Sequence, residues 1–202
     1  MNETGVRLMN KHLMAAAIAA AAVIAAPAHA TSVALAANGN WNEFNVDSAL
    51  AAGGGTGWID EDYAGDDSTL SFTFTIAQGM HGTLSVVDAG FAGDTFSITN
   101  FGSAIGATSG VAAGSSSGPL EFDFDAAFAN PAYSHGVFTL GAGTYSISGS
   151  LLQSVDGDLD ATNGAVRLSV SAVPEPATSA LMLGGFAALA LLARRRKSTT
   201  AI

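Results

Sequence analysis

The sequence predicts an all-β protein, with a single antiparallel β-sandwich between an N-terminal signal peptide and a C-terminal transmembrane helix. Three observations lead to this prediction. Apolar residues alternate with hydroxyl-bearing or acidic residues in several short stretches, a period typical of half-buried strands. Turn clusters rich in glycine separate these stretches. No amphipathic helical pattern of ten or more residues follows the signal peptide, because serine, threonine and glycine interrupt each candidate.

The clearest strand covers Leu70, Phe72, Phe74 and Ile76, which alternate with serine and threonine. The same pattern recurs at Leu84 and Val86, Phe96 and Ile98, Leu120, Phe122 and Phe124, Tyr145 and Ile147, and Val166, Leu168 and Val170. Turns are expected at Gln78-Gly79, His81-Gly82, Asp88-Ala89-Gly90, Ala92-Gly93-Asp94, Gly141-Ala142-Gly143 and Asn163-Gly164. Two stretches rich in glycine, 51–57 and 110–118, are expected to be surface loops.

The N-terminus carries the features of a secretory signal peptide. A 13-residue apolar run from Met14 to Ala26 follows Lys11 and precedes an Ala-x-Ala cleavage site at Ala28 and Ala30. The chain would therefore pass through the Sec translocon, and signal peptidase would leave a mature N-terminus after residue 30. Translation starts at Met1 or Met9. A protein with two membrane spans is the alternative, but the first run is short for a span.

The C-terminus combines three features in a fixed order. Pro174-Glu175-Pro176 precedes an apolar run over 177–193, which ends in Arg194, Arg195, Arg196 and Lys197. As a helix, this run spans about 25 Å, at the short end of what crosses a bilayer core. A basic cluster beside a span stays in the cytoplasm. The sequence thus divides into a signal peptide (1–30), an extracytoplasmic β domain (31–173) and a tail (174–202).

This tail resembles the bacterial PEP-CTERM sorting signal, and the match includes the Pro-Glu-Pro triplet and the three arginines. The resemblance implies that an exosortase, an integral-membrane cysteine protease, cuts near the triplet and passes the protein to the cell surface. An ordinary single-span anchor with a proline-rich linker is the alternative. Residues 72–106 and 136–148 are similar to secreted PEP-CTERM proteins of jelly-roll or galactose-binding-like type, which implies a jelly-roll-like sandwich.

Composition restricts the function of the β domain. Residues 31–173 hold 15 Asp and Glu but one basic side chain, Arg167, so this segment carries a net charge of −14. Such a surface repels phosphate backbones, which argues against nucleic acid as a partner. The chain has no cysteine, which excludes disulfides, thiol catalysis and Cys-based metal centres.

Acidic clusters are the candidates for calcium, although no metal ligand is assigned and no cofactor is expected. Asp156, Asp158 and Asp160 have the spacing that opens an EF-hand loop, but Ala161 and Arg167 replace its turn glycine and its bidentate glutamate. An irregular calcium site and a solvated acidic turn remain as alternatives. A second cluster comprises Asp60, Glu61, Asp62, Asp66 and Asp67. A third set, Glu121, Asp123 and Asp125, is expected on the outer face of one strand.

No catalytic residue is predicted, and the protein is not expected to be an enzyme. Carboxylate pairs hydrolyse glycosides, but the sequence singles out no pair among its many acids. The β domain has two histidines, His81 and His135, too few to close a zinc site without carboxylates. A Gly-x-Ser-x-Gly nucleophile turn is absent from the sequence.

The sequence therefore predicts a noncatalytic exported protein of the cell surface or extracellular matrix. It would pass through a transient single-pass stage in the inner membrane. The resemblance implies association with exopolysaccharide and biofilm. A lectin-like, calcium-dependent carbohydrate-binding module is the alternative, with Trp41 and Trp58 as stacking platforms unless both are core residues.

Overall fold

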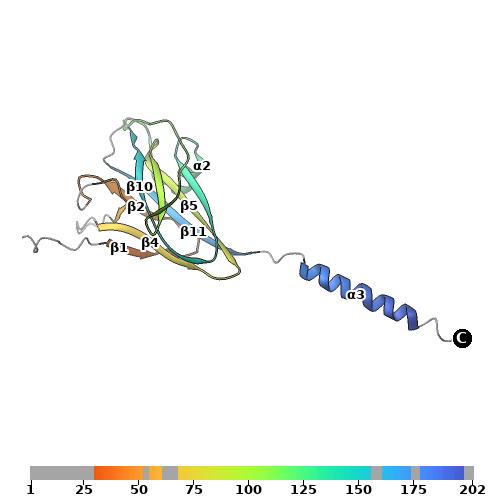
Figure 1. The fold of residues 1–202 in the computed structure, drawn as a ribbon. Coiled ribbons are helices and arrows are strands. Elements are labelled where there is room, and N and C mark those ends of the chain that lie inside the picture. Colours follow the sequence, from red (N-terminus) through yellow and green to blue (C-terminus); the bar gives the residue numbers. More distant parts are fainter. Residues whose placement is uncertain (1–29, 52–54, 61–67, 156–160, 174–177, 198–202) are drawn as a thin grey trace, which may run out of the picture.

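A computed structural model describes residues 30–51, 55–60, 68–155, 161–173 and 178–197. Within them, eleven strands form one sheet in the order β7-β6-β10-β4-β3-β2-β11-β5-β8, with β1 added to β4 and β9 added to β5 (Figure 1). The strands are β1 (Ala30–Ala34), β2 (Asn42–Asp47), β3 (Ile59–Asp60), β4 (Ser68–Ile76), β5 (Met80–Phe91), β6 (Thr95–Asn100), β7 (Ser103–Ala107), β8 (Leu120–Glu121), β9 (His135–Leu140), β10 (Gly143–Gln153) and β11 (Ala161–Ala172). Each described pair is antiparallel except β1 with β4. The all-β prediction is confirmed for the domain.

The sheet is curled and nearly closed, whereas the sequence predicts two stacked sheets. The segment after β7 reaches β9, because Ser109 N donates to His135 O at 2.8 Å. Short β3 lies between β4 and β2, and just before it Trp58 N donates to Gly149 O of β10 at 2.9 Å. Long twisted strands such as β5, with 12 residues, allow a sheet to curl until opposite parts of its inner face pack against each other. The two expected layers are therefore continuous in hydrogen bonding.

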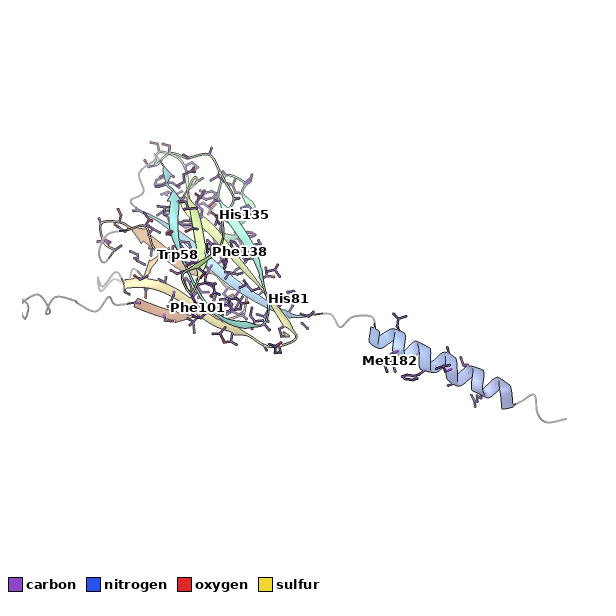
Figure 2. All side chains as sticks on the ribbon, in the orientation of Figure 1. Trp58, His81, Phe101, His135, Phe138 and Met182 are labelled. Carbon is purple, nitrogen blue, oxygen red and sulfur yellow. The ribbon has the colours of Figure 1, made fainter. Side chains whose placement is uncertain are left out.

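The core fills the inside of this curled sheet and is dominated by aromatic rings. Phe44 of β2 stacks on Trp58, with ring centroids 3.9 Å apart, and the edge of Phe96 meets Phe44 at 5.1 Å. Trp58 is 0% exposed, and Figure 2 shows it within the β domain. Gly149 of β10 lies against this indole, since a Cβ there would come within 2.5 Å of Trp58. Burial of these rings supplies much of the hydrophobic stabilisation.

A helix replaces the strand predicted over residues 120–124. Strand β8 covers only Leu120–Glu121, and α2 spans Phe124–Ala129. Asp123 is the N-cap, and its Oδ1 accepts from the backbone N–H groups of Asp125 and Ala126 at 2.9 and 3.1 Å. The cap satisfies helix donors that a strand would pair elsewhere. Glu121, Asp123 and Asp125 consequently do not share one strand face, which corrects the prediction.

Three predicted turns lie inside strands. His81-Gly82 and Asp88-Ala89-Gly90 belong to β5, and Asn163-Gly164 belongs to β11. Glycine is needed at two of these positions by packing, because a Cβ on Gly82 would meet Ile76 at 2.5 Å and one on Gly164 would meet Phe44 at 2.5 Å. These glycines mark close approaches between elements, not reversals of the chain.

Helix α3 (Thr178–Lys197) lies apart from the β domain in Figure 1. Its described apolar side chains are exposed, among them Leu181, Met182 and Phe186. In the described part of the chain, no helix has the length and apolar character needed to cross a membrane, so the predicted span is not confirmed.

Candidate functional site

The C-terminal segment leaves the β domain directly from its last strand. β11 ends at Ala172, and Val173 N donates to Gly79 O at 2.8 Å, which fixes the exit point beside the turn between β4 and β5. Pro174, Glu175 and Pro176 follow at once but lie outside the described residues. The basic residues that follow the apolar run, Arg194 to Lys197, form the end of α3, and Arg194 is exposed.

The predicted signal-peptide cleavage site falls at the first described strand. Ala28 lies outside the described residues, and Ala30 opens β1 opposite Thr69 of β4. Cleavage after Ala30 would leave the pairs from residue 31 to residue 34 intact. The cleavage position stays a prediction.

A pocket of about 290 Å³ opens where the ends of β2, β5 and β8 meet the start of β11. Asn45, Asp47 and Asn163 supply polar groups to its lining, and Phe91 and Phe122 supply aromatic rings. Phe122 is 63% exposed. Sequence reasoning missed this pocket, because its residues come from separate elements and form no contiguous motif.

Two buried carboxylates lie at one side of this pocket. Asp88 of β5 is 0% exposed and Asp94, which precedes β6, is 1% exposed. Asp88 Oδ2 accepts from the N–H groups of Gly93 and Asp94, each at 3.2 Å. Asp94 Oδ1 accepts from Val155 N at 2.7 Å, its Oδ2 accepts from the Thr162 hydroxyl, and Asp94 lines the pocket.

Burial and then the charge of Asp94 raise the pKa of Asp88 to about 8, against the opposing effect of the backbone N–H donors. The sequence prediction placed these two acids in ordinary turns. The residues next to them in the sequence give no signal of burial, because the contacts come from the segment after β10, from β11 and from the segment before β9.

Neither tryptophan is an exposed platform for a sugar ring. Trp58 is a core residue, and Trp41 packs between Phe124 and Phe128 of α2, with centroid distances of 6.2 and 5.6 Å. The interpretation of Trp58 as a core residue is therefore correct. Trp41 holds the helix against the sheet.

The two histidines are kept apart in the fold (Figure 2). His81 Nε2 lies 3.0 Å from Ser171 Oγ at one end of β5, whereas His135 pairs with Val87, six residues along that strand. Six residues correspond to about 20 Å. Among the described residues, no three His, Asp or Glu side chains come together as a metal site.

The acidic clusters proposed for calcium fall mostly beyond the described residues. Asp60 ends β3 opposite Ser68, but Glu61, Asp62, Asp66 and Asp67 lie outside. Asp156, Asp158 and Asp160 also lie outside. Calcium at either loop stays a prediction.

Comparison with known proteins identifies the tail. Residues 172–197 match the family model of the PEP-CTERM protein-sorting motif. The chain therefore carries a PEP-CTERM motif, as its sequence predicts, and this class of motif indicates an exosortase-sorted extracellular protein. No curated protein matches the chain. One solved structure, the pre-peptidase C-terminal domain of collagenase from Bacillus anthracis, is similar at 13% identity and a TM-score of 0.36, over 71% of this chain and 98% of that one.

Proposed function

We propose that the protein is a noncatalytic component of the cell surface or extracellular matrix, delivered there through its PEP-CTERM tail. The observation that carries this proposal is the motif match at residues 172–197, which begins at the last residue of the last strand. A processing enzyme of the exosortase type would cut near Pro174-Glu175-Pro176 and release a complete β domain.

The chemistry of the tail supports such handling. Two prolines remove backbone donors and favour an extended segment, which suits a substrate that enters a protease cleft. The exposed apolar side chains of α3 support a membrane-associated stage before the cut. The basic residues at the end of α3 would hold that end on the cytoplasmic side.

A structural role in an exopolysaccharide matrix or biofilm agrees with the composition of the domain. Its net charge of −14 and its lack of cysteine suit a solvated acidic body that depends on packing for its stability. The predicted absence of catalysis belongs to this proposal.

The sorting role is tested by changing the motif in the producing cell. Glu175→Ala, and separately deletion of Arg194 to Lys197, should leave unprocessed protein in the inner membrane. Ser198→Ala, just beyond the matched residues, is the control and should mature normally. The readout is the intact mass of membrane-bound and released protein. Normal maturation of both motif variants would overturn the proposal.

Carbohydrate binding is a second candidate, favoured by the pocket beside β8. Phe122, whose ring is exposed, lines the same pocket as Asn45 and Asn163. Rings of this kind stack on sugar faces while amides bond to hydroxyl groups.

The two candidates differ in what the purified chain retains. A purely structural component shows no retention on the host's own polysaccharide, with or without calcium. Retention that is lost in Phe122→Ala but kept in Phe101→Ala would favour the carbohydrate-binding candidate. Phe101 is the matched control because it is 64% exposed and lies on the turn between β6 and β7 (Figure 2).

A further inference from the structure

The pocket where β2, β5 and β8 meet β11 offers a carboxylate to a ligand. Asp47 Oδ1 accepts from the backbone N–H groups of Ala49 and Leu50, at 2.8 and 3.1 Å. The second oxygen of this side chain, Oδ2, has no hydrogen-bond partner among the described residues. Asp47 is partly exposed and lines the pocket, so its carboxylate can accept further hydrogen bonds there.

Two neighbouring polar side chains in the lining have donors that are already engaged. Asn163 Nδ2 donates to Glu43 Oε1 at 3.0 Å. The Oδ1 atom of the same amide lies beside Gly90, another lining residue, since a Cβ there would come within 2.9 Å of it. The Thr162 hydroxyl donates to Asp94 Oδ2, and its oxygen keeps its own lone pairs. Both side chains therefore present oxygen acceptors, which suits a ligand rich in donors.

The charge of the lining selects the sign of the ligand. Among the described residues that line the pocket there is no Lys, Arg or His, whereas Asp47 and Asp94 supply carboxylates. Arg167, the single Lys or Arg of residues 31–173, is paired with Asp125 and is not part of the lining. Negative charge repels phosphates and sugar acids and attracts cations.

Aromatic rings and size restrict the ligand further. Phe91 and Phe122 line the pocket, and Phe122 is 63% exposed. An aromatic face attracts an ammonium group and also packs against the apolar face of a sugar ring. The pocket volume of about 290 Å³ is at the small end of ligand pockets, which span about 300–1,000 Å³. These dimensions suit one ring of a glycan chain.

We propose that this pocket binds the protonated primary amine of an amino sugar within a glycan chain. An ammonium group has three N–H donors and no acceptor, so it matches the Asp47 carboxylate and the acceptor oxygens of Asn163 and Thr162. Phe122 packs against the sugar ring that carries the amine. The inference rests on the carbohydrate-binding candidate, because it names the sugar class for the same pocket, and it is independent of the sorting role.

The test is calorimetric titration of the full-length chain with tetraglucosamine and with its N-acetylated counterpart, at pH 6 and low salt. The two oligomers have the same rings and linkages, but N-acetylation removes the charge and two of the three N–H donors of each amine. We expect tetraglucosamine to bind at least 10-fold more tightly, because charge-assisted hydrogen bonds are the stronger ones.

Three variants locate the recognition. Asp47→Asn keeps the oxygen that accepts from Ala49 and Leu50 but removes the charge, so it should weaken tetraglucosamine binding about 10-fold and leave the N-acetylated oligomer unaffected. Asp60→Asn removes a carboxylate outside the lining and is the control, which should bind as the unchanged chain does. Phe122→Ala should weaken the binding of both oligomers.

Four results would overturn the inference. Equal binding of the two oligomers would remove the amine selectivity but keep the carbohydrate-binding candidate. No binding of either oligomer at millimolar concentration would remove both, while the sorting role, which is read from maturation, would stand. Equal losses in Asp47→Asn and Asp60→Asn would reduce the effect to attraction by the net charge of the domain. Spermidine binding as tight as that of tetraglucosamine would show that the amine is recognised without the sugar.

The fold of Asp47→Asn is checked by circular dichroism. If this variant does not fold, the comparison of the two oligomers and of spermidine on the unchanged chain still decides between the inference and its alternatives.

Discussion

The guanidinium of Arg167 lies over the indole ring of Trp41, with its Cζ 4.2 Å from the ring centroid. Arg167 Nη1 and Trp41 Nε1 both donate to Asp125 Oδ1, at 2.7 and 3.0 Å. The hydrogen bond from Trp41 is the larger cause, and the Arg167 guanidinium the smaller one, that holds the pKa of Asp125 below its ordinary value. The only basic side chain of the β domain thus joins β11, α2 and the residue before β2.

Arg167→Ala should therefore loosen α2. The stacked guanidinium contributes about 1 kcal/mol to the free energy of unfolding, while the ion pair with exposed Asp125 adds little because water and salt screen it. Urea unfolding measures the loss, which should persist in 1 M salt. Arg167→Lys, which keeps the charge but not the planar stack, should lose less. Equal stability of the alanine variant and the unchanged chain would contradict the prediction.

The cap of α2 supplies a second prediction. Asp123→Ala removes the acceptor for the N–H groups of Asp125 and Ala126 and should lower the free energy of unfolding by about 1 kcal/mol. Asp123→Asn keeps an acceptor oxygen and serves as the control. Denaturant unfolding compares the two variants, and an equal loss in both would show that the cap is not responsible.

Features contained in a short stretch of the chain were predictable from sequence. The alternation over residues 70–76 predicts β4, and the tail motif matches at residues 172–197. Alternation also runs from Leu120 to Phe124, but there the Asp123 side chain forms a helix cap and the pattern misleads. A period of two over five residues does not distinguish these outcomes.

Features that depend on tertiary contacts were not predictable. Gly164 was interpreted as a turn residue, yet it is required because the Phe44 ring packs where its Cβ would be. Asp88 and Asp94 resemble turn acids in the sequence, and only the curled sheet buries them. The pocket likewise exists only once β2, β5, β8 and β11 meet.

The buried Asp88 also predicts how the free energy of unfolding depends on pH. Between the ordinary Asp pKa of 3.8 and the folded value of about 8, the folded chain holds a proton that the unfolded chain releases. The free energy of unfolding should therefore fall as pH rises through this range, by up to about 1.4 kcal/mol per pH unit, and level off above it. Asp94 and Tyr133 are the titratable neighbours, and burial followed by the charge of Asp88 raises the pKa of Tyr133.

The control for this pH dependence is Asp88→Asn, which has no proton to lose. The difference in unfolding free energy between the unchanged chain and this variant cancels the effects of the other acids. Denaturant unfolding at pH 5, 6, 7 and 8 measures it. A difference that stays constant over this range would show that Asp88 does not titrate with a raised pKa.

The contact between Gly149 and Trp58 gives the last prediction. A Cβ on residue 149 would approach the Trp58 ring at 2.5 Å and the Ser97 carbonyl oxygen at 2.5 Å, and neither backbone nor stacked indole has room to move. Gly149→Ala should therefore cost about 1–3 kcal/mol through overpacking. Gly57→Ala is the matched control. Gly57 forms a β-bridge with Ser150, the residue after Gly149, but a Cβ on Gly57 would come no closer than 4.0 Å to the Gly149 carbonyl oxygen. Urea unfolding followed by tryptophan fluorescence compares the variants, and equal stability of both would mean that the core tolerates a methyl group beside the indole.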